Sequence, residues 1–461
     1  MVAAPSISYS ITVRLEIASG GTAVSELTTT VEEAGGIVTA LDVSPSSAHN
    51  LRIDLTCATS GTEHADRVVA ALEALEDVDV SKVSDRTFLM HLGGVIETRA
   101  KHPLRNRDDL SMIYTPGVAR ICQAIVADRE DARRLTIKRN SIAVVSDGSA
   151  VLGLGNIGPY AALPVMEGKS ALFKSFADID AWPLCLDTQD VDQIVETVAA
   201  IAPGFAGINL EDISAPRCFE IEARLRERLD IPVFHDDQHG TAIVVLAALR
   251  NALRVVDKRI EDVRLVMAGA GAAGTAILRL LIEAGLSDVV VCDVSGVVHA
   301  ERGDTDESLK WIATNTNRGG LTGALKDVLP GSDVFVGVSA PDLIDADDVA
   351  AMAEGSIVFA LANPDPEIDP VIARRHATVV ATGRSDHPNQ INNVLAFPGI
   401  FRGLLDAQSR GIDSAVLLAA ANAIASTVGD DELDANYIVP SVFHPDVHTR
   451  VATAVRDAAR H

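Results

Sequence analysis

Six residues in the second half of the chain constrain its fold more than any other stretch. A short apolar run, 264–268, precedes them, and an apolar pattern with helical spacing, 275–284, follows them. This order of strand, G-x-G-x-x-G and helix predicts a Rossmann-type dinucleotide-binding unit, in which the glycines allow a tight turn and the pyrophosphate lies at the helix N-terminus. The alternative is a glycine-rich helix start that binds no ligand. The six residues are Gly269, Ala270, Gly271, Ala272, Ala273 and Gly274.

An acidic residue ends the next predicted strand. The apolar run 288–292 leads to Asp293, 19 positions after Gly274. A carboxylate at this place accepts hydrogen bonds from the adenine ribose of NAD and repels the 2′-phosphate of NADP. The following Val294 and Ser295 include no basic residue that would neutralise that phosphate. We therefore expect NAD as the cofactor, with NADP as the alternative.

Two acidic pairs lie farther upstream. Glu211 and Asp212 follow the predicted strand 207–210, and Asp236 and Asp237 follow a short apolar run that ends at Phe234. Ligands of α/β proteins gather beyond the carboxyl ends of strands, so these side chains are expected to meet.

Carboxylate oxygens are the ligands that Mg²⁺ and Mn²⁺ prefer. Glu211, Asp212 and Asp237 are therefore candidate metal ligands. Asp236 is expected to orient the groups around the metal without binding it. Helix capping is the alternative role for Asp212 and Asp236. His235 and His239 flank the second pair, but the oxygen ligands suffice without them.

Two further side chains could move protons. Lys169 lies in an apolar helical pattern, where burial is expected to lower the pKa of its amine, as suits a general base. A lysine with its head in water is the alternative. Tyr114 precedes Pro116 and Gly117 and could supply a phenolic proton. The alternative is a core residue, because most buried tyrosines pack in the core and make one hydrogen bond.

The first 90 residues differ in pattern from the rest. Strand-like runs at 7–17, 37–43, 49–56 and 77–89 alternate with two helical patterns, 22–34 and 64–75. The order βαββαβ predicts a ferredoxin-like sandwich. With glycines 20 and 21 after the first strand, it resembles an ACT domain, which implies a small-molecule effector. A structural or dimerising appendage is the alternative.

Composition excludes some classes of partner. The formal net charge of the 461 residues is -25, which disfavours nucleic acid and anionic membranes. The five cysteines are scattered, no signal peptide precedes Ser10, and no run of about 18 apolar residues predicts a membrane span. We expect a cytoplasmic protein.

We therefore predict an α/β protein in three parts. A ferredoxin-like domain covers residues 1–90, a substrate- and metal-binding α/β domain covers 91–236, and a Rossmann-type domain covers 237–392. Helices within 393–461 are expected to complete the substrate-binding domain.

Seven sequence blocks from residue 114 onward resemble the malic enzymes of the bacterial, small-subunit type. The blocks are Tyr-Thr-Pro-Gly-Val-Ala at 114–119, Val-Leu-Gly-Leu-Gly-Asn-Ile-Gly at 151–158, Met-Glu-Gly-Lys at 166–169, Asn-Leu-Glu-Asp at 209–212, Phe-His-Asp-Asp-Gln-His-Gly-Thr-Ala at 234–242, Ala-Asn-Pro at 362–364 and Asn-Gln-Ile-Asn-Asn-Val-Leu-Ala-Phe-Pro-Gly at 389–399.

The resemblance implies oxidation of L-malate, decarboxylation and release of pyruvate. It implies that Tyr114 is the general acid and Lys169 the general base, and that both contact the substrate. It places Asn363 and Asn393 at the substrate carboxylate and the nicotinamide ribose. The metal ligands it implies are Glu211, Asp212 and Asp237. It also implies a homo-oligomer, a dimer or larger.

One position departs from the family. The larger-subunit branch grips the substrate carboxylate with an arginine before its Leu-Gly-Leu-Gly block, where this chain has Ala150. Two rival functions remain at this point. One is an oxaloacetate or tartrate decarboxylase or dehydrogenase on the same scaffold, and the other is a catalytically silent nucleotide-sensing subunit.

Overall fold

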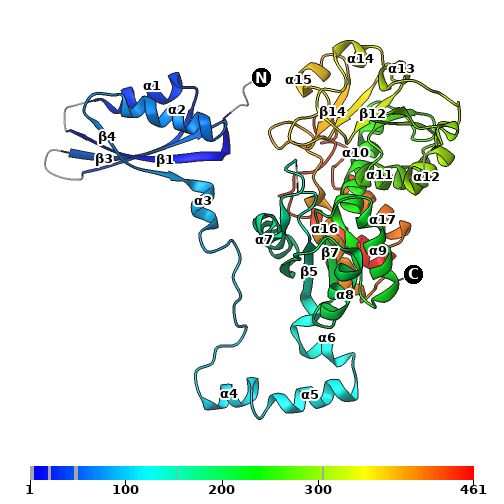
Figure 1. Ribbon diagram of the computed structural model, residues 1–461, viewed down its shortest axis with the longest axis horizontal. Helices are drawn as coiled ribbons and strands as arrows, with labels where there is room; N and C mark the ends of the chain where they lie inside the picture. The colour runs from blue at the N-terminus through cyan, green and yellow to red at the C-terminus, as the bar shows by residue number, and fades with distance from the viewer. Residues whose placement is uncertain (1–4, 19–21, 46–49, 152, 304–305, 461) are drawn as a thin grey trace. The chain divides into compact units, whose positions relative to one another are not determined.

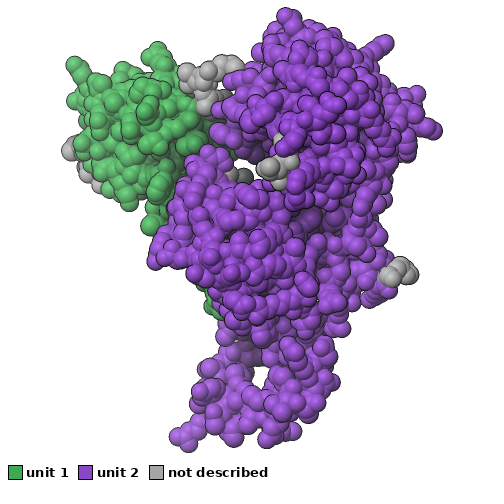
Figure 2. Space-filling view, turned by 45° about the vertical axis from the view of Figure 1, so that its right-hand side comes forward, with its two compact units in different colours: residues 1–98 green, residues 99–461 purple. Residues whose placement is uncertain are grey.

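The chain divides into two compact units, residues 1–98 and 99–461, which Figure 2 colours separately. The computed structural model describes residues 5–18, 22–45, 50–151, 153–303 and 306–460. The predicted glycine turn at 20–21 and Leu152 of the glycine-rich block lie outside the described residues.

The first unit is an antiparallel sheet with strand order β2-β3-β1-β4 and two helices. Alternating strand residues such as Val13, Leu15 and Leu55 are fully buried against Leu27 and Leu72 of the helices. This arrangement is the predicted ferredoxin-like topology, whereas the likeness to an ACT domain stays a prediction. The elements are β1 (Ser6–Ala18), α1 (Val24–Glu33), β2 (Ile37–Pro45), β3 (Asn50–Thr59), α2 (Thr62–Glu73) and β4 (Val78–Asp85).

The predicted final strand 77–89 is too long. β4 ends at Asp85, whose side chain accepts a hydrogen bond from the Phe88 backbone N–H at 3.1 Å. This N-cap begins the short helix α3 (Arg86–His91), because it satisfies a backbone donor that a strand would have paired.

An exposed helical arm, residues 107–140, begins the second unit. It holds α4 (Arg107–Ile113), α5 (Val118–Ala127), α6 (Asp131–Leu135) and the 3₁₀ turn η1 (Ile137–Asn140). In Figure 1, α4 and α5 extend away from the sheets of the unit.

Part of this arm is long and apolar enough to cross a membrane. By length and composition, Arg107–Ala127 is the one such segment among the described residues, although polar residues interrupt its apolar runs. A turn at 114–117 divides it into helices of 7 and 10 residues, each shorter than the roughly 20 residues that a bilayer requires.

A parallel sheet with order β6-β5-β7-β8 follows the arm. Its strands are apolar on both faces, as expected for a parallel sheet covered by helices. One face packs on α8 and α9, and the other on α7, α10 and α16. The elements are β5 (Ser141–Ser146), α7 (Gly158–Ala177), β6 (Asp180–Cys185), α8 (Val191–Ile201), η2 (Ala202–Gly204), β7 (Gly207–Leu210), α9 (Arg217–Arg228) and β8 (Val233–His235).

The second large sheet has the order β11-β10-β9-β12-β13-β14 and is parallel except for the short β11. Its elements are the π turn η3 (Asp236–Gly240), α10 (Thr241–Val255), β9 (Arg264–Ala268), α11 (Ala272–Glu283), β10 (Asp288–Asp293), β11 (Gly296–Val297), η4 (Ala300–Arg302), α12 (Glu307–Asn315), α13 (Leu325–Val328), β12 (Val334–Gly337), α14 (Ala346–Ala350), β13 (Ile357–Ala360), α15 (Pro370–Ala373) and β14 (Val379–Thr382).

One hydrophobic core joins the two parallel sheets. Helix α10 runs between them with Ile243, Val244 and Leu246 fully buried. The last helices pack on the β6-β5-β7-β8 sheet, which is called the first parallel sheet. The Phe397 ring lies 4.6 Å from the Phe173 ring, centroid to centroid, so α16 packs on α7. These last elements are η5 (Asn393–Leu395), α16 (Phe397–Ala407), α17 (Ser414–Ala425) and α18 (Val447–Ala458).

Candidate active site

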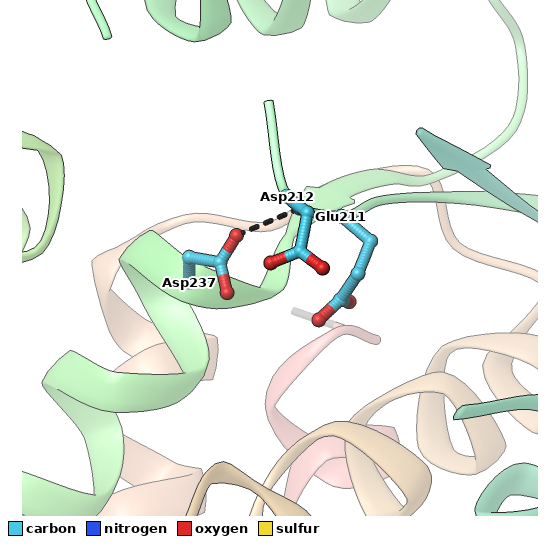
Figure 3. Close-up of side chains that lie close together, drawn as sticks. All are labelled: Glu211, Asp212 and Asp237. Atoms are coloured by element: carbon cyan, nitrogen blue, oxygen red, sulfur yellow. Dashed lines mark hydrogen bonds between the residues drawn. The ribbon is translucent and has the colours of Figure 1, made fainter. Parts of the chain in front are cut away.

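Three carboxylates meet at the carboxyl ends of neighbouring strands. Glu211 and Asp212 follow β7, Asp237 follows β8, and the register pairs Leu210 with His235. One oxygen of each carboxylate lies within 4.8 Å of the other two. Figure 3 shows the three side chains close together. The Asp212 backbone N–H also donates to Asp237 Oδ2 at 3.0 Å. The structure thus brings together the three residues that the sequence proposed as metal ligands.

The buried carboxylates of this cluster form a suitable site for a cation. Burial, followed by mutual repulsion, raises the pKa of Asp212 to about 8. Burial is also the largest cause that raises the pKa of Glu211 to about 7 and that of Asp237 to about 6. Asp212 Oδ2 is buried without a hydrogen-bond partner. Hard oxygen donors with an unpaired lone pair fit a divalent cation such as Mg²⁺ or Mn²⁺.

Lys169 contributes a buried ammonium beside this cluster. Its Nζ lies 2.8 Å from Glu211 Oε1 and 2.6 Å from Asp236 Oδ2, and it also sits over the Phe397 ring, 4.3 Å from the centroid. Burial alone lowers the pKa of Lys169, but the neighbouring carboxylates of Asp236, Glu211 and Asp237 raise it above its ordinary value. The prediction of a lowered pKa is therefore wrong for this arrangement of charges.

Asp236 connects the lysine to the C-terminal part of the chain. Asn393 Nδ2 donates to Asp236 Oδ2 at 2.5 Å, and Asp236 is fully buried. The π turn that carries Asp236 requires a glycine, because a Cβ on Gly240 would lie 2.0 Å from Asp236 Oδ1. Lys169 and Asn393 thus both donate to the Asp236 carboxylate.

The glycine-rich turn at 269–274 has the predicted form. Gly269 has a φ of +118°, and a Cβ on Gly274 would lie 2.0 Å from the Gly269 carbonyl oxygen. A Cβ on Gly271 would meet no atom within 4 Å, so space remains at the N-terminus of α11. This open backbone fits the pyrophosphate of a dinucleotide.

Comparison with known proteins identifies the family. A model of the malic enzyme N-terminal domain matches residues 93–226, and a model of the malic enzyme NAD-binding domain matches residues 238–460. The chain belongs to the malic enzyme family.

Similar proteins agree with this assignment. The chain is 56% identical to the NAD-dependent malic enzyme of Geobacillus stearothermophilus, over 97% of this chain and 94% of that protein. It is 52% identical to the bifunctional malic/malolactic enzyme of Bacillus subtilis, over 79% and 90%. The crystal structure of the NAD-dependent malic enzyme from Thermotoga maritima matches with a TM-score of 0.78 and 47% identity, covering 81% of this chain and 99% of that one.

Tyr114 stands apart from the other candidate residues of this malic enzyme. It ends α4 on the helical arm, and 67% of its surface is exposed. Lys169, on α7, is only 8% exposed. The structure of one chain therefore does not bring the candidate acid to the candidate base.

Asn363 lies in an exposed loop after β13, at the seam between the two sheets. A Cβ on Gly383 would lie 3.4 Å from Asn363 Oδ1, and one on Gly153 would lie 3.1 Å from Pro364 Cδ. The glycine-rich block of the first sheet thus borders the Asn363 loop of the second.

Two charged residues near the candidate site have partners that the sequence analysis did not foresee. Arg217 donates to Asp147 Oδ2 at 2.8 Å and to Ser149 Oγ at 2.9 Å, directly before the Ala150 position. Fully buried Glu367 accepts from the backbone N–H groups of Ser339 and Ala362 at 3.0 and 3.1 Å. Neither residue stands out in the sequence, since Arg217 is one of several charged residues of α9 and Glu367 one of several in a loop.

Proposed function

We propose that this chain oxidatively decarboxylates L-malate to pyruvate and CO₂, using NAD and a divalent cation. The observation that carries the proposal is the buried Lys169 ammonium, which contacts Glu211 and Asp236 beside the carboxylate cluster. Glu211, Asp212 and Asp237 would hold the cation, and the turn at 269–274 would hold the pyrophosphate. When bound, NAD would supply the hydride acceptor, and the cation would supply positive charge to stabilise the oxygen of the forming ketone.

Lys169 is proposed as the base for the C2 hydroxyl. Its amine can accept that proton only after losing its own, and the carboxylates beside it hold that proton. Glu211 is also a proposed cation ligand, so its charge would be shared between the ammonium and a bound cation. Lys169 would then hold its proton less tightly.

Asp236 and Asn393 are proposed to position the reacting groups. Asp236 keeps the Lys169 amine facing the cluster, and the bond to Asp236 orients the Asn393 amide. We propose that the amides of Asn393 and Asn363 bind the malate carboxylate and the nicotinamide ribose.

Tyr114 is proposed to protonate C3 of the enol in the site of a second copy of the chain. Its arm is exposed and carries apolar side chains, among them Leu110 at 49%, Met112 at 67% and Val126 at 89% exposure. Exposed apolar surface of this kind is typical of an interface. A homodimer that exchanges its arms would bury this surface and complete two sites.

Subunit mixing tests the shared site. Lys169→Ala and Tyr114→Phe variants should each be inactive in malate oxidation with NAD and Mn²⁺. After unfolding and refolding together, half of the dimers would combine the two variants, and one site in each would be intact. We expect about a quarter of wild-type activity to return. If none returns although mixed dimers form, Tyr114 does not act across subunits.

We further propose that the first unit binds an effector with a cationic group. A hollow of about 360 Å³ lies where β1 ends and β4 begins, and its lining residues include Glu16, Asp77 and Asp79. Such a lining favours the ammonium of an amino acid over an acyl-CoA. Amino acids should change the malate KM of the full chain but not that of Asp77→Asn/Asp79→Asn, and acyl-CoAs should change neither.

We propose a cytoplasmic location. The five cysteines are free thiols in the structure, as is usual in a reducing compartment. Fractionation of cells that express the chain, followed by malate oxidation assays, should recover the activity with the cytoplasmic marker.

A further inference from the structure

An arginine binds the carboxylate that was expected to recognise the ribose. Arg302, in η4, donates Nη1 to Asp293 Oδ1 at 2.9 Å, and its Nη2 pairs with Asp293 Oδ2. Both side chains are only 16% exposed. Burial raises the pKa of Asp293, but the bonds from Arg302 and from the Ser295 backbone lower it overall. The carboxylate is therefore charged and held in one orientation.

The pair corrects the sequence-based view of this site. The residues directly after Asp293 bring no cation, but Arg302 reaches the carboxylate from nine positions farther along, after the β11 turn. An arginine fork binds phosphate as readily as carboxylate, and with the same two parallel bonds. The site thus contains one group that suits the ribose hydroxyls of NAD and one that suits the 2′-phosphate of NADP.

We propose that Arg302 is a specificity-determining residue of the cofactor site. Its two bonds orient Asp293 toward the ribose hydroxyls and offset the repulsion between Asp293 and a 2′-phosphate. When Asp293 is replaced by a neutral residue, the fork of Arg302 becomes a binding group for that phosphate. The inference rests on the proposed function only in that the turn at 269–274 holds the nucleotide.

A double-mutant cycle on the full chain tests this role. The dissociation constants of NADH and NADPH are measured by nicotinamide fluorescence without malate or metal. Binding can therefore be judged even if malate is not the substrate. Asp293→Ser should tighten NADPH binding about tenfold or more, since a charge-assisted hydrogen bond replaces a repulsion. Arg302→Gln alone should weaken NADPH binding more than NADH binding.

The double variant shows whether the gain in NADPH binding depends on Arg302. In Asp293→Ser/Arg302→Gln the gain in NADPH binding should disappear, while Asp293→Ser/Arg302→Lys should retain part of it. Arg264→Gln is the matched control, because Arg264 pairs with Asp288 at the other end of β10, at 3.0 Å. This control should leave both dissociation constants unchanged.

Two results would overturn the proposal. One is equal NADPH binding by Asp293→Ser with and without Arg302. The other is equal loss of NADH and NADPH binding in Arg302→Gln with a normal melting temperature, which would make Arg302 a support of the loop only.

Discussion

The Asp236 carboxylate lies 2.6 Å from the Lys169 ammonium, and neither side chain is more than 9% exposed. This contact joins α7 of the first sheet to the π turn that leads into the nucleotide-binding sheet. Asn393, 157 residues farther along, donates to the same carboxylate. The position of the lysine is therefore set by groups from three distant segments, and not by its helix alone.

Replacing Lys169 by alanine should nearly abolish malate oxidation. A positioned base contributes about 10²- to 10⁴-fold to the rate, so kcat should fall by at least about 100-fold. NADH binding, measured by fluorescence, should stay near the wild-type value. Lys174→Ala is the control on the same helix, since the Lys174 side chain is 55% exposed. Loss of NADH binding together with activity would mean that Lys169 supports the fold.

Replacing Asp237 by asparagine should weaken Mn²⁺ binding at least tenfold. The change removes one anionic ligand from the cluster while keeping the side-chain shape. Free Mn²⁺ is counted from its paramagnetic resonance signal during a titration. Asp230→Asn, at an exposed position before β8, should bind Mn²⁺ as the wild type does. Full malate turnover of the wild type in excess EDTA would contradict a metal-dependent reaction.

Local patterns predicted the parts of the site that follow strands directly. The turn at 269–274 and the acidic pairs after β7 and β8 are determined by a few neighbouring residues and by the parallel pairing of strands. The partners of these groups were not predictable in the same way. Lys169 meets Asp236 across 67 positions, which depends on how the helices pack on both sheets. The sign of the Lys169 pKa shift followed from that packing.

Two other relationships were not predictable for the same reason. Arg302 reaches Asp293 only because β11 reverses the chain, and a two-residue strand leaves little trace in sequence. Tyr114 belongs to a sequence block that predicts a role in catalysis, but its arm does not fold onto its own chain's Lys169. A sequence motif shows which residues act together without showing which copy of the chain supplies them.

Replacing Gly240 by alanine should disturb the site through Asp236. The added Cβ would lie 2.0 Å from Asp236 Oδ1 and 3.1 Å from the Asn393 Cβ, so the carboxylate must move away from Lys169. We expect a loss of about 1–3 kcal/mol in the free energy of unfolding, as for other overpacked cores, and a lower kcat. Urea unfolding and steady-state assays measure the two effects.

Gly204→Ala provides the comparison, because a Cβ there would meet no atom within 4 Å. It should unfold and turn over malate like the wild type. Normal kcat in Gly240→Ala would show that the exact place of the Asp236 carboxylate does not matter for the reaction.

The last prediction concerns acid stability and the hydrogen bond between Glu222 and His239. Glu222 on α9 is 6% exposed, and its Oε1 lies 2.8 Å from His239 Nε2 in the π turn. Burial raises the pKa of Glu222, but His239 and Arg226 outweigh burial, and the pKa is lowered from 4.5. The pair thus ties the turn that carries Asp236 and Asp237 to the first sheet.

A carboxyl group whose pKa is lowered by folding stabilises the folded state above its unfolded pKa, and this stabilisation is lost as the pH falls through the folded pKa. Glu222→Gln should therefore lose about 1.5–3 kcal/mol of unfolding free energy at about pH 5 to 6, the cost of one hydrogen bond to a charged group. The difference in unfolding free energy between this variant and the wild type should shrink steadily below pH 4.5. Glu220→Gln removes an exposed pair with Arg224 from the same helix and should change stability little at any pH. A gap for Glu222→Gln that stays constant down to acid unfolding would mean that the charge of Glu222 does not hold the turn, and that its packing does.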